Sequence, residues 1–172
     1  MLARLAAREA ARVRVGHALG RIELPTLGRS YIVVEGTDSA ELRKGPGHYV
    51  DTPLPGQRGT VAVAGHRTTY LAPFRTINRL RPGDSVVMAM PYGRFVYRVR
   101  RTRIVAPMAM WVTRRVAYDQ LVLTACHPVY SAARRIAVFA RLVAETPARS
   151  RDSSHTISMT TSAHDTAITA SQ

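Results

Sequence analysis

Short apolar runs, separated by turns rich in glycine and proline, fill the middle of this chain and restrict what it can fold into. Several of the runs alternate apolar with other residues, and they contain many Val and Ile residues. Both properties are typical of β-strands. The predicted strands cover residues 30–34, 59–65, 84–90, 94–105, 120–126 and 135–143. The pattern predicts an all-β sandwich or barrel.

The connections between these strands are expected to contain short helices. Three apolar residues recur at helical spacing within residues 72–80. A second helical turn is expected after Asp38 and Ser39, because both residue types cap helix N-termini well. The longest predicted strand, by contrast, alternates cleanly, with Phe95, Tyr97 and Val99 on one face.

Length and composition divide the chain into three segments. With 172 residues, of which 46% are apolar, it can form one ordinary domain with a core of Val, Ile, Leu and Ala. We place this domain at residues 21–145. Residues 1–20 are a basic, Ala/Arg-rich segment, either helical or disordered. Residues 146–172 are rich in Ser and Thr without hydrophobic period, which predicts a disordered tail that carries no chemistry.

The chain is strongly basic, with a formal charge of +14, and Lys44 is its only lysine. This excess suits anionic partners such as cell-wall polymers, anionic lipid or nucleic acid, and it equally fits a GC-rich coding bias. The densest group is Arg98, Arg100, Arg101 and Arg103, on a predicted strand. No zinc-finger, RNP or helix-turn-helix pattern accompanies it, so nucleic-acid binding is not predicted.

A single cysteine, Cys126, excludes an internal disulfide and a cysteine-rich metal site. It is either a small buried apolar residue or a reactive thiol. Because Pro128 ends the strand, Cys126 lies at a strand end, where side chains face solvent and ligands. A reactive thiol needs a cationic neighbour that favours its thiolate.

Histidine and arginine residues supply candidate partners for the thiol. His127 is adjacent, but consecutive strand residues face opposite ways, so we interpret it as structural or as a pocket wall. His66 ends the apolar run 61–64, and the two strand ends would form a Cys/His site if they met at one rim. Arg134 or Arg135, at the start of the last strand, could stabilise an oxyanion, and the residue pattern alone leaves the choice open.

The ordered set of these motifs resembles the sortase family. The segment 123–126 reads Leu-Thr-Ala-Cys, Arg135 opens the next apolar run, and the segment 64–67 reads Ala-Gly-His-Arg. The order His, Cys, Arg is also the order of the family. Similar segments, at 34–37, 45–49, 55–57, 73–74 and 80–84, extend the likeness over about residues 20–143. The Cys-His-Pro and Gly-His-Arg-Thr-Thr sequences look most like actinobacterial class E sortases.

This resemblance implies a closed eight-stranded β-barrel with short helices in its connections. It implies His66, Cys126 and Arg135 as the catalytic residues, and it selects Arg135 over Arg134. We add Thr124, Ala125 and His127 as predicted substrate-binding residues; Ala125 stands where the family often has Thr. No metal or other cofactor is expected, because no acidic cluster or metal-ligand motif accompanies these residues.

The resemblance also implies a reaction and a location. A sortase cleaves an L-P-x-T-G or L-A-x-T-G sorting motif of a secreted protein through a cysteine thioacyl intermediate. It then transfers the protein to an amine of a peptidoglycan precursor or a pilin. We therefore expect an extracytoplasmic location with membrane association, although no apolar run here is long enough to span a bilayer and residues 1–20 lack a signal-peptide pattern.

Three alternatives remain at this point. A papain-like peptidase would place its cysteine before its histidine and at the start of a helix, the reverse of the order here. A degenerate, inactive sortase is disfavoured by the intact set of three residues. A catalytically inactive basic β-barrel that binds anionic cell-wall polymer would not need Cys126, and its binding would weaken steeply with salt.

Overall fold

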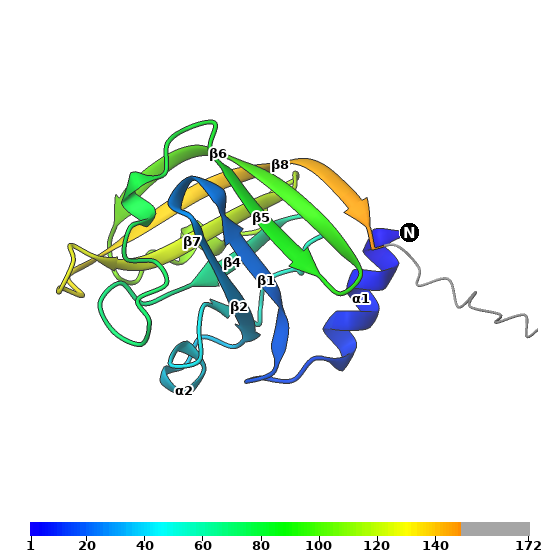
Figure 1. The fold of residues 1–172 in the computed structure, drawn as a ribbon, viewed down its shortest axis with the longest axis horizontal. Helices are drawn as coiled ribbons and strands as arrows, with labels where there is room; N and C mark the ends of the chain where they lie inside the picture. Colours follow the sequence, from blue (N-terminus) through cyan, green and yellow to red (C-terminus); the bar gives the residue numbers. More distant parts are fainter. Residues whose placement is uncertain (149–172) are drawn as a thin grey trace, which may run out of the picture.

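The computed structural model describes residues 1–148, and within them eight strands close into a barrel (Figure 1). The strand order around the barrel is β1-β2-β3-β4-β7-β8-β6-β5. The strands are β1 (Ala18–Leu24), β2 (Arg29–Glu35), β3 (Gly47–His48), β4 (Thr60–Ala64), β5 (Ser85–Met90), β6 (Gly93–Val105), β7 (Gln120–His127) and β8 (Arg134–Pro147). The expected all-β class and eight-stranded closed barrel are confirmed.

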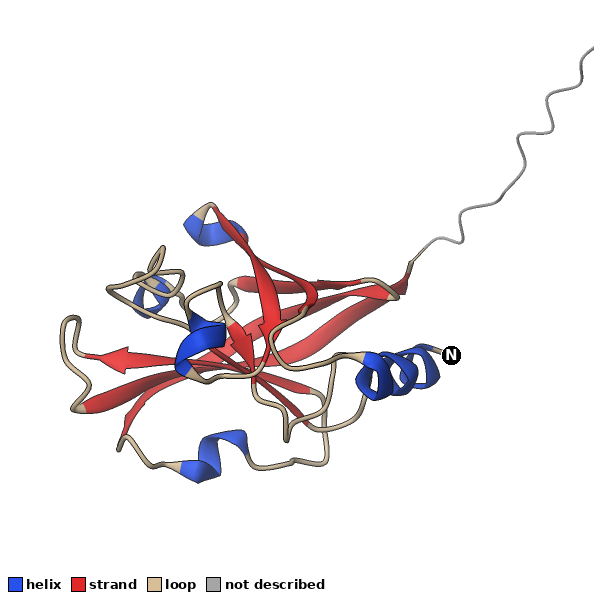
Figure 2. Cartoon of the chain, turned by 90° about the horizontal axis from the view of Figure 1, so that it is seen from below, coloured by secondary structure: helices blue, strands red, loops and turns tan. Residues whose placement is uncertain are grey.

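Short helices lie in the connections and outside the sheet (Figure 2). They are α1 (Leu2–Arg12), η1 (Pro25–Leu27), α2 (Ser39–Leu42), η2 (Ile77–Arg79) and η3 (Met110–Thr113). The helix expected after Asp38 is α2. The helical spacing within residues 72–80 produces only a single 3₁₀ turn, η2, preceded by turns.

The apolar core fills the barrel, and its composition follows from which faces of each strand are covered. All five residues of β4 and the first six of β7 are buried, so both strands read as continuous apolar runs. In β6 the residues from Gly93 to Val99 alternate between buried and less buried, as predicted. The pairing with β8 is irregular between Val99 and Arg101, and from there the exposed residues are consecutive.

A second, smaller apolar cluster lies on the outer face of the sheet. It contains Val105, Val112, Val122, Ala137 and Phe139. The segment that carries η3 packs there, with the Trp111 ring stacked on Phe139 at a centroid distance of 5.9 Å. This segment therefore covers part of the outer face of β7 and β8.

The six predicted strands all occur, and β1 and β3 were not predicted. β3 has only two residues, too few for any periodicity to show. β1 begins at Ala18, inside the segment that we set apart as residues 1–20. At the other end, β8 continues to Pro147, past the predicted boundary at residue 145. The rest of the predicted tail, residues 149–172, lies outside the described residues.

The helix α1 packs its apolar side against one end of the barrel, on the right in Figure 1. Leu2 and Ala6, one helical turn apart, are buried in the main core, and the arginines of the helix are exposed. Among the described helices, none is both long and apolar enough to cross a membrane.

Candidate active site

Parallel pairing of β4 with β7 brings their carboxyl ends to one edge of the barrel. Ala64 lies opposite Thr124 in the register, and the Gly65 amide donates a hydrogen bond of 3.0 Å to the Thr124 carbonyl. His66 follows β4 directly, and Cys126 lies near the end of β7. The two strand ends therefore meet in the fold, which is the condition that the sequence analysis set for a Cys/His site.

Antiparallel pairing of β7 with β8 places the two candidate arginines on different faces of the sheet. Cys126 lies opposite Arg135, and His127 lies opposite Arg134. Residues directly opposite each other share a face of the sheet, so Arg135 lies on the face of the thiol and Arg134 on the other. This geometry agrees with the choice that the resemblance implied.

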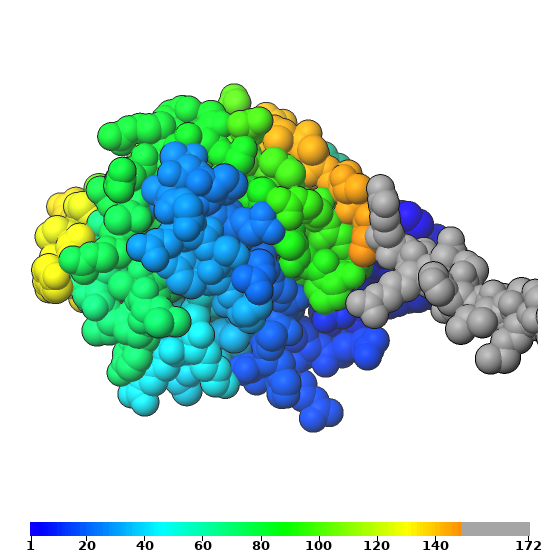
Figure 3. All heavy atoms as spheres, in the orientation of Figure 1, coloured from blue at the N-terminus to red at the C-terminus, as the bar shows by residue number. Residues whose placement is uncertain are grey.

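One cavity of about 350 Å³ is lined by all three residues of the expected catalytic set. Its other lining residues come from the β2–β3 connection, from the residue after β3 and from the same strand ends: Thr37, Ser39, Leu42, Tyr49, Ala64, Gly65, Thr124 and Ala125. The loops after β4 (green) and β7 (yellow) gather at the end of the molecule away from α1, on the left in Figures 1 and 3. The side chains of Arg75 and Tyr130 join these loops through a hydrogen bond of 3.0 Å.

His66 is half-buried in this cavity and retains an unused nitrogen. Its Nε2 is buried and has no hydrogen-bond partner among the described residues. Burial lowers the pKa of His66 below its ordinary value, because desolvation disfavours the imidazolium. The described residues therefore give this nitrogen no structural role, and His66 lines a cavity that is also lined by the thiol.

A strained loop follows His66 and shapes its surroundings. Tyr70, Leu71 and Ala72 all have positive φ angles, of 47°, 66° and 40°. Non-glycine residues rarely adopt this conformation, and such strain concentrates at functional sites. The Tyr70 ring lies 5.3 Å from the His66 ring, and the Phe74 amide donates to the His66 carbonyl at 3.0 Å. The loop thus contacts His66 twice, through the Tyr70 ring and through the Phe74 amide.

Gly65 is required by the packing beneath this loop. A Cβ atom at Gly65 would lie 2.5 Å from the Phe74 ring, which is fully buried. The glycine therefore lets Phe74 pack directly against the backbone that carries His66. This contact connects the barrel core to the position of the histidine.

Arg135 is fixed by backbone carbonyls beside the cavity. Its Nη1 donates to the Ala132 carbonyl at 3.0 Å and to the Arg134 carbonyl at 3.1 Å. Arg135 also lines a second, apolar cavity of about 70 Å³ under the segment 105–113. Tyr49 and Thr124 line both cavities, so the two spaces adjoin around these three residues.

The three predicted substrate-binding residues separate in the structure. Thr124 and Ala125 line the cavity, and Thr124 Oγ1 is hydrogen-bonded to the Tyr49 hydroxyl at 3.0 Å. His127 is not among the residues that line the cavity, and its Nδ1 contacts Arg67 Nη1 at 3.2 Å. This position agrees with the alternation of strand faces that argued against His127 as the partner of the thiol.

The sequence did not identify several lining residues. Tyr49 bonds a residue 75 positions away, and Thr37, Ser39 and Leu42 approach the cavity from the β2–β3 connection. The segments 34–37 and 45–49 carried part of the family resemblance, which was the only available signal for them. The contact itself depends on the pairing of β3 with β4.

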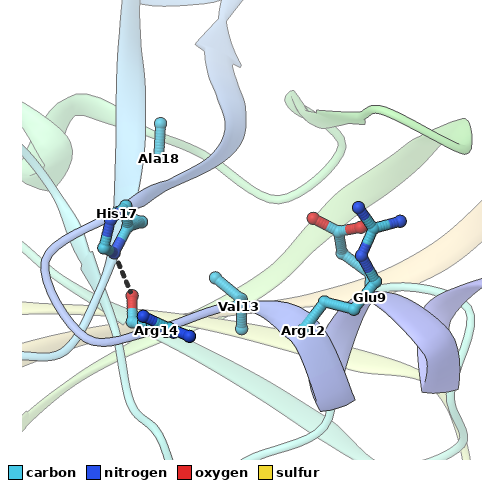
Figure 4. A pocket seen from close by; sticks show the side chains of 6 residues that line it. All are labelled: Glu9, Arg12, Val13, Arg14, His17 and Ala18. Atoms are coloured by element: carbon cyan, nitrogen blue, oxygen red, sulfur yellow. Dashed lines mark hydrogen bonds between the residues drawn. The ribbon is translucent and has the colours of Figure 1, made fainter.

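A larger cavity, of about 410 Å³, lies between α1 and the start of β1 (Figure 4). It is lined by Glu9, Arg12, Val13, Arg14, His17 and Ala18. His17 Nδ1 bonds the Arg14 carbonyl at 3.3 Å, on an exposed surface, and the lining contains no nucleophile. Within residues 1–148, no three His, Cys, Asp or Glu side chains approach closely enough to hold a metal ion.

Comparison with known proteins yields a consistent set of matches. A family model described as a sortase domain matches residues 22–143. Sortase D of Bacillus subtilis is 34% identical over 132 residues, which are 74% of this chain and 65% of that protein. Sortase SrtE1 of Streptomyces coelicolor is 29% identical over 148 residues, which are 77% of this chain and 42% of that protein. This chain thus spans less than two thirds of the length of either relative.

Solved structures agree with these matches. Sortase E from Streptomyces avermitilis superposes with a TM-score of 0.72 at 34% identity, covering 78% of this chain and 93% of that one. The SrtF sortase from Corynebacterium diphtheriae superposes with a TM-score of 0.75 at 28% identity, covering 82% and 92%. Sortase E1 from Streptomyces coelicolor, solved with a tripeptide in its active site, gives 0.71 at 27% identity, covering 77% and 91%.

Proposed function

The chain belongs to the sortase family, and on this premise we propose that it is a cysteine transpeptidase that anchors surface proteins at the cell envelope. The observation that carries the proposal is the shared cavity of His66, Cys126 and Arg135, in which His66 Nε2 has no structural partner. An unpartnered buried nitrogen costs about 1–3 kcal/mol. A group that costs stability and lies beside a thiol is best explained by chemistry.

Acylation of the enzyme is the first step. The Cys126 thiolate attacks the carbonyl carbon of the motif threonine, and the carbonyl π electrons move to the oxygen. Arg135 stabilises this oxyanion by its fixed charge. When the oxyanion collapses, the C–N bond breaks and the His66 imidazolium gives its proton to the leaving glycine amine. A thioester on Cys126 and a neutral His66 result.

Transfer to an amine completes the cycle. The acceptor amine attacks the thioester carbonyl, a second oxyanion forms beside Arg135, and His66 takes the proton that the amine loses. Collapse then releases the Cys126 thiolate and forms the new amide bond. If water attacks in place of the amine, the same steps give hydrolysis.

The substrates follow from the family rather than from the cavity. We propose secreted proteins with a C-terminal L-P-x-T-G or L-A-x-T-G motif as donors, with cleavage between Thr and Gly. The acceptor is an amine of a peptidoglycan precursor or a pilin, and the place of action is the outer face of the plasma membrane or the cell wall. Thr124 and Ala125, which line the cavity beside the thiol, are the proposed substrate contacts on β7.

Binding of anionic cell-wall polymer is the second candidate function, and a charged surface favours it. Arg101 and Arg141 are exposed and lie over the rings of Phe139 and Tyr118, at 5.0 Å and 4.9 Å. Among residues 1–148, the only ion pairs are Arg94–Glu23 and His48–Glu35, so neither of these arginines has a carboxylate partner. Exposed guanidinium groups on aromatic rings suit a polymer of repeated phosphate or carboxylate groups.

A peptide assay tests the transpeptidase directly. Quenched fluorescent L-P-x-T-G and L-A-x-T-G peptides are incubated with the protein, with and without an amine, and mass spectrometry follows the protein. We expect cleavage, an acyl adduct on Cys126 and an aminated product, all absent in Cys126→Ala. A folded wild-type protein that forms no adduct with either peptide would count against the transpeptidase.

Substitution of charged residues distinguishes polymer binding from transpeptidase activity. Arg101→Ser/Arg141→Ser and the control Arg21→Ser/Arg29→Ser remove equal charge from different faces. If the polymer binds at the first pair, only that variant loses retention on immobilised wall teichoic acid, and Cys126→Ala retains it fully. Equal losses in both charge variants would show that retention reflects net charge alone.

A further inference from the structure

Arg67 is a buried cation without a carboxylate partner. Only 3% of its surface is exposed, and no ion pair within residues 1–148 includes it. Burial lowers the pKa of the Arg67 guanidinium, and the charge of Arg75 lowers it further, whereas a negative charge on Cys126 acts in the opposite direction. Burying a charge without a partner is costly, so core stability alone does not explain this residue.

The hydrogen bonds of Arg67 join two segments that are distant in sequence. On one side, its Nε and Nη2 donate to the Arg75 carbonyl at 3.3 and 3.2 Å, and Nη2 donates to Asn78 Oδ1 at 3.0 Å. On the other side, Nη1 donates to the Cys126 carbonyl at 3.3 Å and to His127 Nδ1 at 3.2 Å. The first segment follows His66, and the second carries the thiol.

The guanidinium also determines which nitrogen of His127 carries a proton. A guanidinium only donates hydrogen bonds, so Nδ1 must accept with its lone pair and the ring proton lies on Nε2. Protonation of Nδ1 would break this bond and place a second cation against Arg67. His127 therefore serves as a neutral acceptor that anchors Arg67, and the proton transfer remains with His66.

From these contacts we propose that Arg67 is a positioning residue, which holds the His66 loop against the end of β7 and places a buried positive charge behind the Cys126 backbone. Because the Arg67 guanidinium donates hydrogen bonds to both segments, it fixes the separation of His66 from Cys126. The charge of Arg67 and a negative charge on Cys126 attract each other. The consequence for turnover depends on the proposed transpeptidase function, and the consequence for the reactivity of Cys126 does not.

Alkylation of Cys126 tests the charge without any substrate. The chain has one cysteine, so each iodoacetamide adduct reports on Cys126 alone. We expect Arg67→Gln to slow alkylation at pH 7 by roughly 3- to 10-fold, because the buried positive charge that attracts a negative charge on Cys126 is lost. Arg67→Lys, which keeps the charge, is expected to stay within about twofold of the wild type. Arg79→Gln is the matched control, because it removes one positive charge from an exposed arginine of the same connection.

The fork geometry is tested by turnover of the motif peptide. Lysine cannot bond both segments, so Arg67→Lys should lower kcat about tenfold with little change in KM. Thermal unfolding and circular dichroism establish that each variant is folded, and Arg67→Lys carries the test if Arg67→Gln does not fold. Wild-type alkylation of folded Arg67→Gln would overturn the role of the charge, and wild-type kcat in Arg67→Lys would overturn the fork. If the wild-type protein turns over no peptide but the Arg67 variants still differ from it in alkylation rate, the result would contradict the transpeptidase function and support the role of the Arg67 charge.

Discussion

Two histidines on neighbouring strands of the barrel have opposite surroundings. His48 lies in β3 and pairs in the register with Val63 of β4, three residues before His66. His48 is 2% exposed, and its Nδ1 lies 2.8 Å from Glu35 Oε2. Its Nε2 lies 3.1 Å from the Pro53 carbonyl. His66, by contrast, has a buried Nε2 that finds no hydrogen-bond partner within residues 1–148.

The difference separates a structural histidine from a reactive one. Both nitrogens of His48 face acceptors, because Thr52 Oγ1, 3.0 Å from Nε2, uses its proton on the Tyr49 carbonyl. The ring and Glu35 thus belong to a fully bonded cluster that fixes β2 against β3. Among the described residues, His66 takes part in no such cluster. Within residues 1–148 the fold satisfies both nitrogens of His48 and leaves Nε2 of His66 without a hydrogen bond.

Substitution of His66 should cause the largest effect on catalysis and the smallest on stability. We expect His66→Ala to lower kcat/KM for the motif peptide by about 10³-fold, the range for loss of a general acid–base group. The free energy of unfolding should not fall by more than about 1 kcal/mol, since no structural hydrogen bond of the side chain is lost and the cost of its unpartnered nitrogen is removed. Peptide kinetics and urea denaturation measure the two quantities. A stability loss as large as the catalytic one would remove the contrast with His48.

Substitution of His48 should give the inverse result. His48→Ala leaves the buried Glu35 carboxylate unpaired, so we expect a loss of about 3 kcal/mol in the free energy of unfolding. The kcat/KM per folded molecule should stay within about threefold of the wild type. Glu35→Gln is the control, and the double variant should lose less than the sum of the single losses, because both break one interaction. Additive losses would mean that the two residues act independently.

The sequence predicted much of the fold because its strands are locally encoded. Six strands followed from alternation and turns, and the position of Cys126 at a strand end followed from Pro128. The parallel pairing of β4 with β7, which brings His66 to the thiol, is a long-range property. From the residues alone, a Cys/His site was predicted only on the condition that the two strand ends meet. The expectation that they do meet came from the family resemblance.

The contrast between the histidines could not be read from the sequence. His48 and His66 both follow glycine, and nothing local distinguishes them. Their difference depends on Glu35 and Pro53, which reach His48 through the β2–β3 pairing and a loop. Arg67 was noted only as part of a motif, because its partners at the end of β7 lie 59 and 60 residues away.

Replacement of Gly65 should lower both the stability of the protein and its catalytic rate. An added Cβ would lie 2.5 Å from the buried Phe74 ring, so Gly65→Ala must displace the ring or the backbone of His66. We expect a loss of about 2 kcal/mol in stability, the usual cost of overpacking, and about a tenfold loss in kcat. Urea denaturation and peptide kinetics measure both. Gly28→Ala, where φ is +60° and no atom lies within 4 Å of the added Cβ, controls for the loss of glycine's backbone freedom without a clash. A change in stability alone would show that Phe74 yields without moving His66.

The smallest expected effect is on the acidic limb of the pH profile. As the pH falls, His66 takes up a proton while Cys126 is still a thiol, and this doubly protonated form cannot start the reaction. Because burial lowers the pKa of His66 below its usual 6.5, kcat/KM should keep more than half of its maximum at pH 6.5. Tyr70→Ser removes the ring that lies against His66 and should move the limb up, towards 6.5. Tyr130→Ser, an exposed tyrosine of the β7–β8 loop, should leave it unchanged. A wild-type limb at or above pH 6.5 would mean that His66 titrates like a solvated histidine, and its unpartnered Nε2 would then lose its significance against His48.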